Sequence, residues 1–197
     1  MKTFVAFYGL SANPVTLGHV MVLSHLLLND PSVEKILVVP CYQQVGKKLA
    51  PYNRRVEYCQ AGFGWLPKVE VSRIEEGTFS ITVETIRRLK REHPDWNLRF
   101  VMGADLLDTA PAWAGWEELK RLAPPLTVGR AGIQSYDTPT PICPAVSSTI
   151  VREGLWEGRY ADVERYLPRP VLDLIKEDEN YLDPKKRRQP VPQEVEG

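Results

Sequence analysis

Residues suited to phosphate chemistry gather near the amino terminus, between Gly9 and His19. Gly9 permits backbone angles that a side chain would forbid, so the chain can turn sharply as it leaves a strand. Pro14 then restricts the backbone, and a helix opens at Thr16. Free N–H groups at a helix N-terminus attract phosphate, Gly18 lets it approach closely, and His19 can donate a hydrogen bond. Taken alone, the segment also fits a plain strand-to-helix turn with a capping threonine.

A second candidate segment lies far along the chain, at Ser147, Ser148, Thr149 and Arg152. Consecutive hydroxyls before a helix cap its N-terminus, and they can also donate to phosphate oxygens. Arg152 follows one turn later, where its planar guanidinium can reach the outer phosphates of a triphosphate. Standing alone, this segment is better explained as a simple Ser/Thr cap followed by an exposed arginine.

The elements between these segments predict an α/β fold. Short β-rich runs alternate with helical patterns, which is typical of a Rossmann-like parallel sheet flanked by helices. We expect strands at Thr3–Tyr8, Lys35–Val39, Lys68–Val71, Leu98–Met102 and Leu126–Val128. We expect helices at Leu17–Asn29, Tyr52–Phe63, Ile81–Glu92 and Trp116–Leu122. The first turn then lies at the carboxyl ends of the strands, where ligands usually bind.

The pattern becomes helical after Pro144, with helices expected at Ser148–Glu157, Tyr160–Tyr166 and Pro168–Glu177. We interpret these as a small segment packed onto the sheet, so that residues 1–182 form one domain that is helical from about residue 146. The tail, 183–197, is charged and proline-rich without periodicity, and we expect it to be disordered. Its Lys-Lys-Arg-Arg run can bind an anionic partner, although a solvated tail is the better interpretation.

The composition is that of an ordinary soluble globular protein, with 43% hydrophobic and 25% charged residues. A formal net charge of zero gives no electrostatic case for a nucleic-acid or membrane partner. The apolar run Val20–Leu28 is shorter than the roughly 20 residues that a membrane span needs. Cys41, Cys59 and Cys143 form no CxxC pair and no metal cluster, so we expect a reducing, cytoplasmic location.

Together, the two segments resemble the paired signatures of the nucleotidyltransferase superfamily. Gly9-Leu-Ser-Ala-Asn-Pro-Val-Thr-Leu-Gly-His19 is similar to its glycine-rich His/Thr-x-Gly-His signature, and Ser147-Ser-Thr-Ile-Val-Arg152 is similar to its second, carboxyl-terminal signature. Their order and separation also fit. The resemblance implies that His19, Thr16 and Arg152 are catalytic. It implies that ATP is bound by Gly9, Ser11, Gly18, His19, Gly103, Asp105, Ser147, Ser148, Thr149 and Arg152.

The middle of the chain resembles the bacterial nicotinate-nucleotide adenylyltransferases. The matching stretches are the loop from Pro40 to Lys47 with Arg55 beyond it, Phe79–Thr85, Gly103–Asp105 with Trp113, and Thr127–Arg130. The resemblance implies that Lys47 and Arg55 hold the acceptor's phosphate, with Lys48 able to replace Lys47. It also implies that Thr82 contacts the ring substituent and that Trp113 stacks on a pyridine ring, although a core position explains Trp113 equally well.

Some residues depart from this family, which leaves alternatives open. Thr16 stands where the family usually has a histidine, and Leu10, Ala12, Asn13 and Gly46 replace a glycine, an aromatic residue, an aspartate and a histidine. A pantetheine-phosphate adenylyltransferase would match Thr16 better. A preference for the nicotinamide nucleotide is a second alternative. A nucleotide-sensing protein without catalysis is a third, of a different class.

The resemblance implies that AMP is transferred from ATP to nicotinate mononucleotide, with release of pyrophosphate, in NAD biosynthesis. Direct attack by the acceptor's 5′-phosphate needs no covalent enzyme intermediate, so catalysis depends on positioning and charge stabilisation. Mg²⁺ is expected to arrive on the ATP phosphates, because the sequence shows no carboxylate cage. The expected partners are thus ATP and a pyridine mononucleotide, with no nucleic acid and no membrane, and a homo-oligomer is left open.

Overall fold

The computed structural model describes residues 2–44, 46–129, 146–178 and 181. Within them, five parallel strands form one sheet in the order β3-β2-β1-β4-β5. The strands are β1 (Phe4–Leu10), β2 (Val33–Pro40), β3 (Val69–Val71), β4 (Leu98–Gly103) and β5 (Pro125–Val128). This confirms the predicted Rossmann-like parallel sheet, with strand bounds that differ from the predicted ones by up to two residues. The expected tail, 183–197, lies outside the described residues.

The order of the strands reverses at β1, and this opens the sheet at its carboxyl end. β1 pairs with β2 along its whole length, from Phe4↔Val33 to Leu10↔Pro40. Its pairing with β4 runs only from Val5↔Leu98 to Phe7↔Phe100. The tips of β1 and β4 therefore separate, and such a switch in strand order is where open α/β sheets bind ligands.

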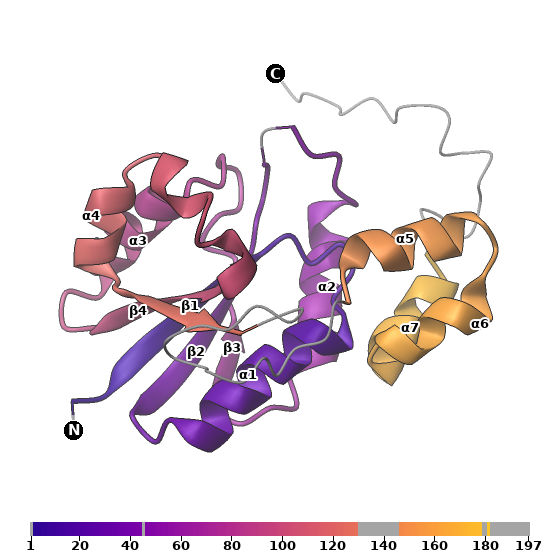
Figure 1. Cartoon of the computed structure of the whole chain (residues 1–197), viewed down its shortest axis with the longest axis horizontal. Coiled ribbons are helices and arrows are strands. Elements are labelled where there is room, and N and C mark those ends of the chain that lie inside the picture. The colour runs from indigo at the N-terminus through magenta and orange to yellow at the C-terminus, as the bar shows by residue number, and fades with distance from the viewer. Residues whose placement is uncertain (1, 45, 130–145, 179–180, 182–197) are drawn as a thin grey trace.

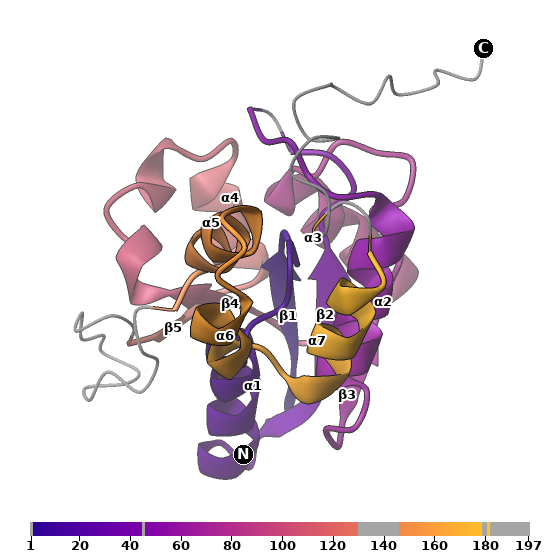
Figure 2. The same cartoon turned by 90° about the vertical axis from the view of Figure 1, so that its right-hand side faces the viewer.

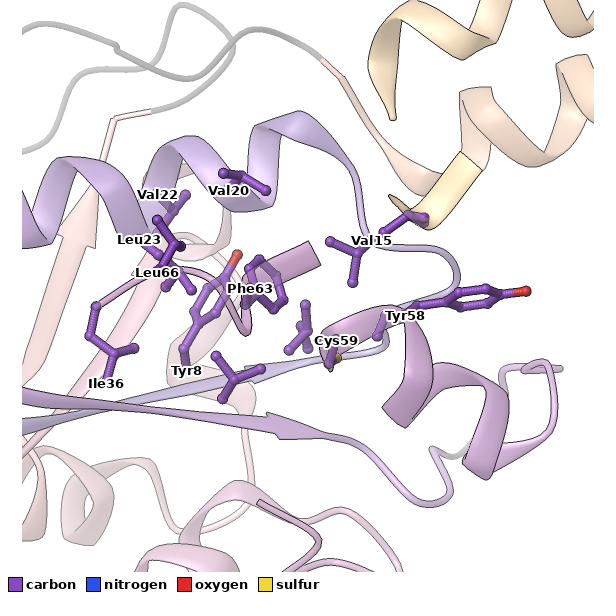
Figure 3. Packing of buried hydrophobic residues seen from close by; sticks show 14 of the residues in the cluster. Tyr8, Val15, Val20, Val22, Leu23, Ile36, Tyr58, Cys59, Phe63 and Leu66 are labelled. Carbon is purple, nitrogen blue, oxygen red and sulfur yellow. The ribbon is translucent and has the colours of Figure 1, made fainter. Parts of the chain in front are cut away.

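Helices cover both faces of the sheet, because the strands bury side chains on both sides. Phe4, Ala6 and Tyr8 face one cluster, which α1 (Leu17–Asn29) and α2 (Tyr52–Phe63) complete. Val5 and Phe7 face the other, with α3 (Thr82–Glu92) and α4 (Trp116–Leu122). Figure 3 shows the first cluster, in which side chains from β1, β2, α1 and α2 meet.

The carboxyl-terminal helices lie at one end of the sheet, beside α1 and α2 (Figures 1 and 2). They are α5 (Ser148–Trp156), α6 (Tyr160–Val163) and α7 (Arg169–Lys176). The helix predicted at Tyr160–Tyr166 is instead α6 followed by the 3₁₀ turn η3 (Glu164–Tyr166). The extended Leu167, which precedes a proline, ends the helical path there. α7 shares the first hydrophobic cluster with α2.

None of the helices in the described part of the chain has the length and apolar character needed to cross a lipid bilayer.

The contact of α5 with α6 gives a test of this packing. A Cβ at Gly154 would overlap the side chain of Val163. We expect Gly154→Ala to lower the free energy of unfolding by about 1–3 kcal/mol, because overpacking must push the two helices apart. Urea unfolding measures this. Glu153→Ala, at the exposed neighbouring position of the same helix, is the control and should change stability little. Equal destabilisation by both variants would contradict the packing described.

Candidate active site

A cavity of about 630 Å³ opens between the separated tips of β1 and β4. Residues of the loop after β2 and the first residues of α3 and α5 complete its walls. Most of the predicted site residues line it: Gly9, Ser11, His19, Lys47, Thr82, Gly103, Trp113, Ser147, Ser148, Thr149 and Arg152. Thr16, Gly18, Arg55 and Asp105 lie elsewhere, and each of them has a different setting.

Thr16 is hydrogen-bonded to His19 and is not among the described residues that line the cavity. Thr16 is completely buried at the N-cap of α1, and its backbone N–H donates to His19 Nδ1 at 3.0 Å. Its Oγ1 lies 2.9 Å from the same nitrogen. A neutral imidazole whose Nδ1 accepts a hydrogen bond carries its proton on Nε2. Thr16 thereby orients His19 and sets Nε2 as the donor nitrogen, rather than contacting a phosphate itself.

Gly18 differs from the expectation that it admits a phosphate. It is buried, and a Cβ there would lie 3.4 Å from the carbonyl oxygen of Val146. Val146 leads directly into the second signature at Ser147. Gly18 therefore lies beside the segment that leads into the second signature, and it is not among the described residues that line the cavity.

The two signatures are joined by hydrogen bonds from side chain to backbone. Ser148 Oγ donates to the carbonyl of Pro14 at 2.7 Å, from 134 residues away in the sequence. Arg152 Nη1 donates to the carbonyl of Asn13 at 2.7 Å. Its Nη2 donates to Thr149 Oγ1 at 3.1 Å. The sequence predicts that the Ser148 hydroxyl donates to phosphate. In the structure it donates to the turn after β1 instead.

Arg55, expected to hold the acceptor's phosphate, is buried and is not among the described residues that line this cavity. The side chain is 1% exposed, and burial lowers the pKa of its guanidinium. All three guanidinium nitrogens donate to backbone carbonyls, those of Ala50, Ser11, Cys41 and Tyr42. Buried carbonyls need such donors. Arg55 therefore holds the loop after β2 against the first turn.

Asp105, expected among the residues that bind ATP, is not among the described residues that line the cavity. It is exposed on the 3₁₀ turn η1 (Ala104–Leu106), while Gly103 and Leu106 line the cavity on either side of it. The Gly-x-Asp stretch therefore reaches the site through its glycine.

Trp113, Lys47 and Lys48, which the resemblance implies to bind the acceptor, line the cavity. Trp113 is half-buried, with its ring 5.9 Å from Phe100 and 6.2 Å from Trp116, and it also lines the cavity. Trp113 therefore packs against the core and also lines the cavity, which are the two alternatives that the sequence left open. Lys47 and Lys48 are exposed on the cavity's loop wall.

Thr82 is the first residue of α3, not its cap. The N-cap is the extended Ile81, and within the described residues no side chain caps this helix. The first turn of α3 at the cavity wall therefore offers backbone N–H groups to an anion.

Sequence reasoning missed several residues of the cavity wall, among them Asn13, Cys41, Gln44 and Glu75. Glu75 is 5% exposed and accepts a hydrogen bond from Thr85 Oγ1 at 2.6 Å. Burial raises the pKa of the Cys41 thiol, with the charge of Glu75 as a smaller cause. The acidic pair at 75–76 gave no signal, because a charge pair in a loop is usually solvated.

The described residues contain no group of three His, Cys, Asp or Glu side chains placed to hold a metal ion. Among the described residues that line the cavity, Glu75 is the one with an acidic side chain.

Comparison with known proteins places this chain in a family. The model of the cytidylyltransferase-like family matches residues 7–154. A protein named probable nicotinate-nucleotide adenylyltransferase from Myxococcus xanthus is 32% identical over 161 residues, covering 78% of this chain and 83% of that protein. One of the same name from Anaeromyxobacter sp. (strain K) is 31% identical over 183 residues, covering 90% and 96%.

A solved structure supports the same fold. The Plasmodium falciparum nicotinic acid mononucleotide adenylyltransferase complexed with NaAD superposes with a TM-score of 0.78 at 21% identity, covering 89% of this chain and 95% of that one. These findings confirm the family that the two signatures and the middle of the chain resemble. The chain therefore belongs to the cytidylyltransferase-like family and, within it, to the nicotinate-nucleotide adenylyltransferases.

Proposed function

We propose that AMP transfer from ATP to nicotinate mononucleotide takes place in this cavity, with His19 and Arg152 acting on the phosphates. The observation that carries the assignment is the joining of the two signatures. Arg152 and His19 line one cavity, and Arg152 is bonded to the turn from which the helix of His19 starts. A phosphate chain in that cavity therefore has a neutral donor and a cation at fixed positions.

The reaction needs one displacement. An oxygen of the acceptor's 5′-phosphate attacks the α-phosphorus of ATP, and the bond from that phosphorus to the pyrophosphate oxygen breaks. Negative charge grows on the leaving pyrophosphate. Arg152 stabilises it, because a guanidinium carries more N–H donors than its two bonds to protein use. His19 donates from Nε2 to the phosphate being transferred. Both groups are set in place before reaction, so little reorganisation is needed.

A second group of cavity residues suits the acceptor. Trp113 offers a flat apolar surface to the pyridine ring, and Lys47 and Lys48 offer cations to the 5′-phosphate. The start of α3 at Thr82 offers N–H groups and the positive end of a helix dipole to a ring carboxylate. A carboxylate carries a full negative charge and an amide does not, so this group supports nicotinate over nicotinamide.

The position of Thr16 does not favour phosphopantetheine as the acceptor. Because it is completely buried and bonded to His19, its identity bears on the histidine and not on the acceptor. ATP is taken to enter with Mg²⁺ on its phosphates, which supplies further positive charge there. The free thiols of Cys41 and Cys59 fit a reducing cytoplasm.

The acceptor is tested by pyrophosphate release with ATP and Mg²⁺. We expect kcat/KM to be highest for nicotinate mononucleotide, lower for nicotinamide mononucleotide, and undetectable for phosphopantetheine. A preference for the amide would overturn the proposed role of the α3 start, and absence of turnover with every acceptor would overturn the function.

His19→Ala tests the transferring end. We expect kcat to fall about 100-fold or more, because a donor to the developing charge is lost. His25→Ala is the matched control on the same helix, where the ring contacts Asn29 instead of the cavity. Full activity in the His19 variant would contradict the mechanism.

Trp113→Ala tests the acceptor's end. We expect KM for the mononucleotide to rise about tenfold, because the stacking surface is lost, while KM for ATP changes little. The control is Trp65→Ala, because Trp65 is 64% exposed and is not among the described residues that line the cavity. An equal rise in both KM values would place Trp113 in the core alone.

A further inference from the structure

A buried hydroxyl from the carboxyl-terminal end of the described chain reaches the turn formed by residues 9–19, here called the catalytic turn. Tyr181 is 2% exposed, and its O–H donates to Asn13 Oδ1 at 2.7 Å. The two residues are 168 positions apart in the sequence. Asn13 is itself 4% exposed and lines the cavity.

Asn13 connects three separate segments. Its Oδ1 accepts from Tyr181 and, at a longer 3.3 Å, from the backbone N–H of Ala50 in the loop after β2. Its backbone carbonyl accepts from Arg152 on α5. A shift of Asn13 would therefore move the carbonyl oxygen to which the Arg152 guanidinium donates.

Tyr181 is held firmly enough to fix Asn13. Its ring packs edge-on against Tyr58 of α2, with 6.1 Å between centroids. The Tyr58 hydroxyl donates to Asp178, which is 2% exposed, and Arg54 Nε lies 3.9 Å from the same carboxylate. Burial, and then the hydrogen bond to Asp178, raise the pKa of Tyr58, so its proton stays in that bond at neutral pH.

We propose that Tyr181 is a positioning residue for adenylyl transfer, a role that rests on the proposed function. Tyr181 fixes the side chain of Asn13, and the carbonyl of Asn13 fixes Arg152 over the phosphates of ATP. Without the hydroxyl, the bond that remains to Asn13 Oδ1 within the described residues is the longer one from Ala50. The loss acts on the ATP side of the cavity, because the carbonyl of Asn13 accepts the hydrogen bond from Arg152.

Tyr181→Phe removes the hydroxyl and keeps the ring against Tyr58. We expect kcat/KM for ATP to fall about tenfold, in line with the loss of one well-placed hydrogen bond, while KM for the mononucleotide stays within about twofold. Tyr58→Phe is the matched control, and we expect a smaller loss there, because Tyr181 keeps its bond to Asn13. It removes the neighbouring buried hydroxyl, which bonds Asp178 and not the catalytic turn. Thermal unfolding of both variants measures the stability that each has lost.

A double-mutant cycle with Asn13→Ala completes the test. We expect Tyr181→Phe to cause little further loss in the Asn13→Ala background, because the two changes remove one interaction. Wild-type kinetics in Tyr181→Phe, an equal loss in Tyr58→Phe, or independent effects in the cycle would each overturn the proposal.

Calorimetric ATP binding separates this proposal from the proposed function. A wild-type chain that binds ATP but releases no pyrophosphate with any acceptor would end the proposed function. The affinity for ATP would still decide the role of Tyr181, because weaker binding in Tyr181→Phe than in Tyr58→Phe supports it. Equal affinity in the two variants would contradict it.

Discussion

The site depends on one constraint: the backbone carbonyls of the irregular turn after β1 are taken out of water and must be hydrogen-bonded. The carbonyls of Ser11, Asn13 and Pro14 each accept from a side chain of another element. Those donors are Arg55 on α2, Arg152 on α5 and Ser148 on α5. Satisfying the turn thus assembles the cavity, because the donors bring the loop after β2 and the second signature against it.

This arrangement divides the polar residues into two groups. Thr16, Arg55 and Ser148 direct the bonds described here to protein atoms, and they hold the turn, the loop and the histidine in place. His19 and Arg152 line the cavity, and each is also tied to the protein by a bond that orients it. A reactive group held in this way keeps its geometry because its supports are themselves buried.

Much of the scaffold was predictable, because it follows from the periodicity of hydrophobic residues and from residues that end helices and strands. The bounds of α1, α2 and α4 agree with the helical patterns, since prolines, glycines and short polar runs delimit them. The split of the predicted helix at Tyr160–Tyr166 into α6 and η3 was not predictable, since it depends on how Leu167 turns into α7. Asn13 attracted attention only as a departure from the family, yet it connects Tyr181, Ala50 and Arg152.

The sequence by itself determined the parallel α/β fold, the two candidate segments for phosphate binding and the kinds of side chain that meet. These follow from local propensity and residue chemistry, which neighbours along the chain supply. Only the tertiary structure decided which polar groups face the cavity and which face the backbone. Arg55 and Lys47 look alike in the sequence, but Arg55 is buried among carbonyls while Lys47 is exposed on the cavity wall. The physical reason is that burial and hydrogen-bond partners come from segments distant in sequence, as Ser148 and Pro14 are.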